Sequence, residues 1–213
     1  MTEAKIQEVR DLLNAAVVEL KGDKMKSYDN EKLDSDLLVR YQYLADFMGF
    51  GEEDLKAING AAPILAQLVP DITAAVYRKL FSYSNTKKYF LQRNEGFTGE
   101  LASDMEHLGM EHEQINMRRM ILGKYLGRLV TTSVIDLSFV KYLDYVGKVH
   151  TPKAGAQSIN IPLLHMNALM GFINDALTII VINLGLTRDQ EITLIRAFTK
   201  LLWIQEEFIT KHY

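Results

Sequence analysis

The stretch Phe139-Val-Lys-Tyr-Leu-Asp-Tyr-Val-Gly-Lys-Val-His150-Thr-Pro152 carries the clearest structural signal in the chain. Three apolar residues and one histidine recur in it at i, i+4, i+7 and i+11: Phe139, Leu143, Val146 and His150. This spacing predicts a helix with all four on one side, and Pro152 ends that helix just after the histidine. A histidine on an apolar stripe needs a partner, because an unpaired buried polar group costs free energy. A metal ion is one such partner, and a protein group that satisfies a purely structural histidine is the commoner one.

Size and charge limit the class of protein. With 213 residues the chain is long enough for one domain with a sizeable core and short for two. Hydrophobic residues make up 48% of it, which argues against disorder along the whole length. The net charge is −3 and no basic stripe is concentrated anywhere, so we expect no nucleic-acid partner.

The chain contains no cysteine. Disulfides, thiolate metal sites, iron–sulfur clusters and cysteine nucleophiles are therefore excluded. The lack of disulfides fits a reducing compartment, so we expect a cytoplasmic protein. The first residues are charged and lack the apolar core of a signal peptide. The most membrane-like run, residues 168–186, is interrupted by Asn174, Asp175 and Asn183. It predicts a deeply buried helix of a soluble protein and no membrane partner.

Nearly every segment has helical spacing, since proline is scarce and alternating β-branched runs are missing. The expected helices cover residues 5–21, 33–48, 52–67, 70–83, 116–130, 136–150, 162–184 and 187–208. Asp136 is the expected cap of the helix that carries His150, and Thr187 with Gln190 has the spacing of a capping box. The last two helices are long and antiparallel, joined by a turn at Gly185. The sequence therefore predicts an all-α fold with no strands.

Four segments of the chain, in this order, are similar to helices of one known family. Residues 71–90, with Tyr77 inside them, resemble its B–C helix region. Residues 142–150 resemble its F helix, where a glycine three residues before the proximal histidine is usual; here that pair is Gly147 and His150. The family comprises the protoglobins and the globin domains of globin-coupled sensors.

The two remaining segments follow in order. Residues 161–172, with Pro162, resemble the start of the family's G helix, and the last helix, with Lys200 and Gln205, resembles its H helix. The similarity spans residues 33–213, and the order of four weak motifs carries it. It implies a globin-like fold, a 3-over-3 helical sandwich that lacks a D helix and has extra N-terminal helices. We therefore expect a haem-binding globin domain at residues 31–213, after a helical extension at residues 1–30.

The resemblance also assigns roles to individual residues. It implies haem b (iron protoporphyrin IX) as cofactor, His150 as the proximal ligand of its iron, and Tyr77 as the distal hydrogen-bond donor to bound O₂. The other residues that it places around haem are Val76, Phe81, Phe90, Leu122, Val146, Leu164, Leu169 and Phe172. Protoglobins often carry tryptophan before the distal tyrosine, and Val76 there makes the pocket less crowded.

The chemistry of such a site explains these residue types. Haem iron takes a neutral imidazole nitrogen, and the other ring nitrogen usually donates to a carbonyl; a carbonyl near Val146, four residues back, is the candidate acceptor. Bound O₂ carries partial negative charge, so a hydrogen bond from Tyr77 would stabilise it by roughly 1.5–3 kcal/mol. Without the resemblance, Tyr77 fits equally well as a core tyrosine, and His165 is better explained as a core histidine than as a ligand.

Three functions follow from this reading. The first is a gas sensor or carrier that binds O₂, CO or NO, forms a homodimer through its last two helices and signals to a separate partner. The second is a haem enzyme for NO dioxygenation or peroxidase-like turnover, against which stand the lack of an evident His/Arg pair near Tyr77 and of a flavin or nicotinamide fingerprint. The third is a haem-free globin module that binds proteins, which the presence of His150 disfavours.

Overall fold

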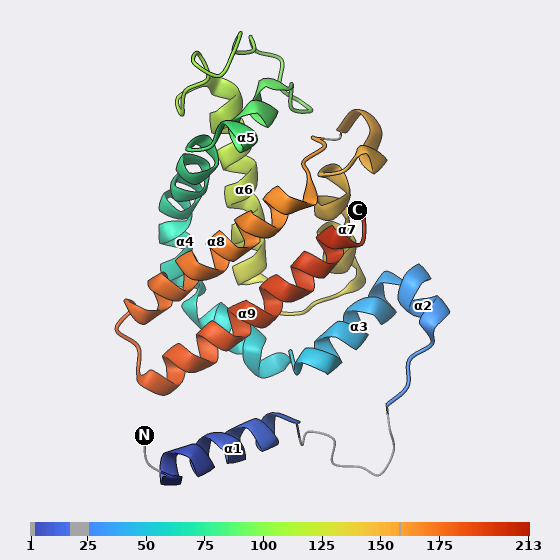
Figure 1. The fold of residues 1–213 in the computed structure, drawn as a ribbon, viewed down its shortest axis with the longest axis vertical. Coiled ribbons are helices and arrows are strands. Elements are labelled where there is room, and N and C mark those ends of the chain that lie inside the picture. Colours follow the sequence, from blue (N-terminus) through green and yellow to red (C-terminus); the bar gives the residue numbers. More distant parts are fainter. Residues whose placement is uncertain (1–2, 18–25, 158) are drawn as a thin grey trace.

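The computed structural model describes residues 3–17, 26–157 and 159–213, and every regular element in them is helical (Figure 1). The elements are α1 (Glu3–Val17), α2 (Asn30–Ser35), α3 (Leu37–Met48), α4 (Glu52–Phe81), α5 (Ser84–Lys87), the 3₁₀ helix η1 (Lys88–Leu91), α6 (Glu113–Thr131), α7 (Leu137–Val149), the 3₁₀ helix η2 (Pro152–Gln157), α8 (Leu163–Ile182) and α9 (Arg188–Thr210). The prediction of an all-α fold is confirmed.

The N-terminal helix α1 lies outside the bundle in Figure 1, and nearly all of its described side chains are exposed. The predicted first helix extends to residue 21, but residues 18–25 lie outside the described part of the chain. The second predicted helix, 33–48, is divided in the structure. Asp36 ends α2 and caps α3, where its carboxylate accepts from the Leu38 and Val39 amides at 2.9 and 3.2 Å.

Helix α4 is one continuous helix of 30 residues that includes Pro63 and Pro70. The prediction that one helix ends near residue 67 and another begins at Pro70 is therefore wrong. A proline inside a helix removes one backbone hydrogen bond and costs about 3 kcal/mol. Tertiary packing outweighs that cost here, because the helix buries apolar side chains on both sides of the prolines, including Leu65 and Val76.

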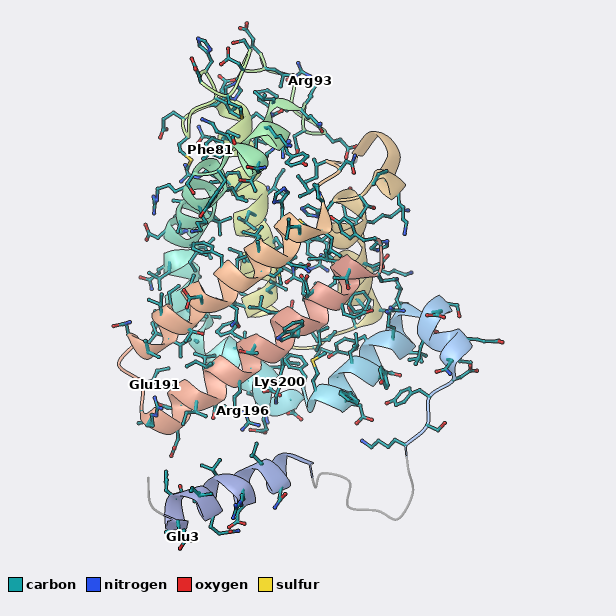
Figure 2. The ribbon with its side chains drawn as sticks, in the orientation of Figure 1. Glu3, Phe81, Arg93, Glu191, Arg196 and Lys200 are labelled. Carbon is teal, nitrogen blue, oxygen red and sulfur yellow. The ribbon has the colours of Figure 1, made fainter. Side chains whose placement is uncertain are left out.

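The segment between α4 and α6 contains only the short helices α5 and η1. Residues 92–112 then form a loop without helix, which agrees with the expected lack of a D helix. The loop is nevertheless ordered by specific contacts, because Arg93 donates to the carbonyls of Phe97 and Gly99 at 2.9 and 2.8 Å. Figure 2 shows Arg93 at the same end of the molecule as Phe81, the last residue of α4.

Helices α8 and α9 pack side by side and are connected through Gly185, whose φ of 70° requires the left-handed backbone that glycine adopts freely. The predicted capping box of α9 is present, with Thr187 and Gln190 as its two members. Helix α8 is long and apolar enough to cross a membrane by length and composition, but only 22% of it is buried. The prediction that this helix is deeply buried is wrong, because only one of its faces meets the core.

Helix α7 contacts α9 so closely that a side chain has no room between them. A Cβ atom added to Gly147 would lie 2.2 Å from the Phe208 carbonyl oxygen and 2.8 Å from Ile209 Cα. Real Cβ atoms do not approach other atoms that closely, so glycine is required at this contact. The close packing of α7 against α9 thus explains why a glycine stands at position 147, three residues before His150.

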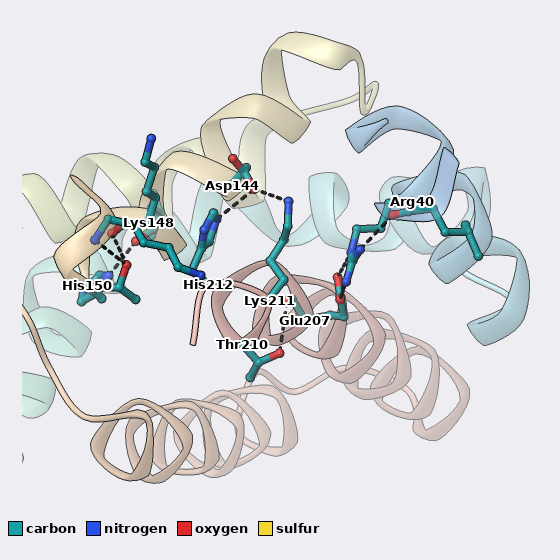
Figure 3. Close-up of polar contacts among 12 residues, drawn as sticks. Arg40, Asp144, Lys148, His150, Glu207, Thr210, Lys211 and His212 are labelled. Atoms are coloured by element: carbon teal, nitrogen blue, oxygen red, sulfur yellow. Dashed lines mark hydrogen bonds and ion pairs between the residues drawn. The ribbon is translucent and has the colours of Figure 1, made fainter. Parts of the chain in front are cut away.

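Ion pairs hold the same helices together (Figure 3). The carboxylate of Asp144 on α7 accepts from Lys211 Nζ at 2.8 Å and lies 2.9 Å from His212 Nε2, both just past the end of α9. On α3, Arg40 Nε donates to both oxygens of Glu207 on α9 at 2.9 and 3.0 Å. These pairs are partly buried, so they are less screened by solvent than pairs on an open surface.

Replacing Gly147 with alanine should destabilise the protein, because the added methyl group would force α7 away from α9. Overpacking of this kind costs about 1–3 kcal/mol. Thermal or urea denaturation of Gly147→Ala should show that loss. Gly127→Ala on α6 is the matched control, since a Cβ there meets nothing within 4 Å; it should be neutral or stabilising. Equal stability of the two variants would contradict the close contact.

Candidate functional site

A cavity of about 370 Å³ lies among α4, α6, α7, α8 and the end of α9, with walls that are mostly apolar. Its size falls within the roughly 300–1,000 Å³ of pockets that hold small molecules and cofactors. His150 from α7 and Tyr77 from α4 both line it. Figure 1 shows α4 and α7 on either side of α6, so the two residues belong to different parts of the cavity wall.

His150 follows the last residue of α7 and is oriented by its own helix. Its Nδ1 lies 2.6 Å from the Val146 carbonyl oxygen, which confirms the predicted acceptor. A carbonyl only accepts, so Nδ1 carries the hydrogen and Nε2 of the neutral ring has a free lone pair. Burial lowers the pKa of His150 from 6.5, and the positive charge of Arg118 lowers it too, although the bond to Val146 acts the other way. The imidazole is therefore neutral at pH 7.

The segment after His150 folds back and satisfies the end of α7. The amides of Ile159 and Ile161 donate to the Val149 and His150 carbonyls at 2.9 and 2.8 Å. The Tyr213 hydroxyl donates to the carbonyl of Ile161 at 2.5 Å and to that of His150 at 3.3 Å. The last carbonyls of a helix lack partners within it, so these bonds fix the backbone that carries the imidazole.

Tyr77 is buried, with 6% of its surface exposed, and its ring packs 5.5 Å from the ring of Phe90 between centroids. Burial raises the pKa of Tyr77 above its usual value of 10.0, so the phenol stays protonated and can donate a hydrogen bond. No described residue accepts that bond. The hydroxyl is therefore available to a group inside the cavity.

The predicted wall residues divide into two groups. Those that line the cavity are Val76, Phe90, Leu122, Val146 and Leu169. Phe81 lies one layer further out, with its ring 5.4 Å from that of Phe90. Phe172 is half-buried against the same cluster but does not line the cavity.

Leu164 does not form part of the wall, since 74% of its surface is exposed. The residues of α8 that sequence reasoning missed are Met166, Met170 and Ile173, which line the cavity instead. Their i, i+4, i+7 spacing is the signal that would have found them. Leu164 falls on a different side of the helix from this stripe, which explains its exposure.

Two further parts of the wall were not predicted. No His/Arg pair near Tyr77 is evident in the sequence, but the structure places Arg118 of α6 in the cavity wall, with 5% of its surface exposed. Asn94 and Glu95, from the loop before α6, line it as well. Fully buried Gln114 holds that loop in place, because its side chain donates to the Phe90 carbonyl at 2.9 Å and accepts from the Asn94 amide at 2.8 Å.

These residues fit a haem group. The cavity offers one neutral imidazole with a free nitrogen, an apolar wall and few polar groups. Three buried polar atoms of its lining residues, the Tyr125 hydroxyl, Arg118 Nε and Gln205 Oε1, have no hydrogen-bond partner among the described residues. Buried polar atoms are nearly always paired, so orphans around one cavity indicate that a further group completes it.

Comparisons with known proteins agree with this geometry. The sequence model of the protoglobin family matches residues 38–213. The chain belongs to the protoglobin family. Among solved structures, it is similar to the globin domain of the Geobacter sulfurreducens globin-coupled sensor, with a TM-score of 0.64 and 13% sequence identity over 81% of this chain and 96% of that one. No match was found among curated protein sequences. The resemblance and the globin-like fold predicted from the sequence are both confirmed.

Proposed function

We propose that this protoglobin binds haem b through His150 and holds O₂, CO or NO reversibly on the side of Tyr77. The observation that carries the proposal is the 2.6 Å contact between His150 Nδ1 and the Val146 carbonyl at the cavity wall. It supports ligation because it presents an unprotonated nitrogen in a fixed direction, as histidine ligands of metals do. The similar solved structure belongs to a sensor, which favours gas sensing, with a separate cytoplasmic partner to receive the signal.

Each part of the site has a task in that function. Bound haem supplies an iron position that a diatomic gas can occupy. Val146 keeps His150 in the correct tautomer and orientation. The methionine and isoleucine side chains of α8 exclude water from the cavity, and the Tyr77 phenol donates to a ligand that carries negative charge. CO carries little such charge, so Tyr77 favours O₂.

The purified protein should show a Soret absorption band after hemin is added, and His150→Ala should lose most of it. His165 is the matched control, because it is the other histidine that lines the cavity within the described chain. His165→Ala should keep the band, since its ring packs against Tyr89 rather than being held at the end of α7. A wild-type protein that folds yet stays colourless with hemin would refute haem binding; loss of the band only in His165→Ala would assign the ligand to His165.

Replacing Tyr77 with phenylalanine should speed O₂ release about tenfold to a hundredfold, as expected for the loss of one hydrogen bond to a charged acceptor. CO release should change little. Stopped-flow or flash-photolysis measurements give both rates. Tyr41→Phe removes a hydroxyl outside the cavity and should match the wild type. If Tyr125→Phe accelerates O₂ release and Tyr77→Phe does not, the donor is Tyr125.

We also propose a homodimer that buries the outer faces of α8 and α9. Six of the seven exposed positions of α8 form a stripe at helical spacing that is apolar or small except for one carboxylate: Leu164, Ala168, Gly171, Asp175, Ile179 and Ile182. The seventh, Asn167, is polar. On α9, Ile192 and Trp203 are also exposed, the latter by 62%. A stripe of this kind on two adjacent helices suits a second copy of the same surface.

Ile179→Lys should halve the molecular mass measured by light scattering, because a lysine would be buried in the dimer contact. Met120→Lys is the matched control: Met120 is equally exposed, at 55% against 53% for Ile179, but lies on α6. It should leave the mass unchanged. A wild-type monomer at every concentration would refute the dimer.

A further inference from the structure

Arg118 is an unusual side chain for an apolar cavity. Among the described residues that line this cavity, it alone carries a permanent positive charge. It lies on α6 one helical turn before Leu122, which lines the same wall. Both Arg118 and Tyr77 pack against Phe90: the guanidinium carbon lies 5.0 Å from the ring centroid and the phenol ring 5.5 Å from it. The cation and the distal phenol thus share one aromatic neighbour in the cavity wall.

The protein satisfies this guanidinium only in part. One terminal nitrogen donates to the Gln92 carbonyl at 3.2 Å, while Nε is buried with no partner among the described residues. No carboxylate of the described residues pairs with it. Burial lowers the pKa of Arg118, but arginine remains protonated in proteins because its ordinary pKa is so high.

A buried cation without a counter-ion destabilises a fold, and replacing it with an apolar residue often stabilises the fold. Such a group is consistent with a role in binding an anion inside the cavity. Arg118, Tyr77 and His150 all line the same cavity, so the guanidinium charge acts inside it. Its field therefore covers the space between the phenol and the imidazole.

We propose that Arg118 and Tyr77 together form a distal anion site, so that this haem pocket takes small inorganic anions that bind ferric iron, such as azide, fluoride or nitrite. The proposal rests on haem binding through His150. Arg118 supplies the charge and a planar set of N–H donors, and Tyr77 supplies a hydroxyl donor. Neutral CO gains nothing from the charge.

The test is azide titration of the ferric, haem-loaded full chain, followed by its absorption spectrum. In Arg118→Met, which keeps the length of the side chain and removes the charge, the azide dissociation constant should rise about tenfold to a hundredfold, as for one charge-assisted hydrogen bond. Fluoride should follow azide. CO affinity of the ferrous protein should stay within about twofold of the wild type, because CO is uncharged.

Arg119→Met is the matched control. Arg119 is the next residue on α6, is only half-buried and does not line the cavity. Its charge also lowers the pKa of Tyr77, so its loss should weaken azide binding much less than the loss of Arg118 does. Arg118→Gln, which keeps N–H donors without the charge, should fall between the wild type and Arg118→Met. It also serves as the test variant if Arg118→Met does not fold.

Azide affinity equal to the wild type in haem-loaded Arg118→Met would overturn the proposal. Hemin titration of the same variant then identifies the alternative, because weaker hemin binding would mean that Arg118 pairs with the carboxylate groups of haem. Failure of the proposed function looks different, since the wild type itself would then show no Soret band. The two results cannot be confused.

Discussion

The close contact between α7 and α9 at Gly147 is the constraint on which the site depends. It sets the depth and tilt of α7, and His150 follows that helix directly, so the position of the imidazole is a consequence of backbone packing. Asp144, paired with Lys211 and His212, fixes the rotation of the helix about its axis. The Val146 carbonyl then fixes the rotation of the ring. Together these contacts fix the position of α7, its rotation about its axis and the orientation of the His150 ring.

Local signals in the sequence were reliable where the interaction itself is local. Asp136 caps α7, and Thr187 and Gln190 form the capping box of α9. The helix boundary predicted at Pro70 was wrong because burial along the whole of α4 outweighs the free-energy cost of a proline inside a helix. A short stretch of sequence around Pro70 does not reveal that burial. The burial of α8 was overestimated for a related reason, since hydropathy does not say which faces of a helix meet the rest of the chain.

The site was predictable in part. Periodicity placed His150 on an inward stripe, and the resemblance to protoglobins pointed to Tyr77; the structure brings the two to one cavity. Arg118 was not predicted as part of the cavity wall because a charged residue on a helix ordinarily faces solvent. Its burial depends on the loop before α6, which brings Phe90 and the Gln92 carbonyl over it. Gln114 on α6 holds that loop in place through its hydrogen bond to the Phe90 carbonyl. The burial of Arg118 therefore depends on a contact between residues far apart in the sequence.

The end of α9 has a mechanical consequence. The residues after α9 bind α7 and the segment that follows His150, through Lys211, His212 and Tyr213. The opposite end of α9 is joined to α8. A helix of 23 residues is a rod of roughly 34 Å. The Gly147 contact, at Phe208 and Ile209, lies near one end of this rod, so the helix links the backbone that carries His150 directly to the turn before Arg188 at the other end.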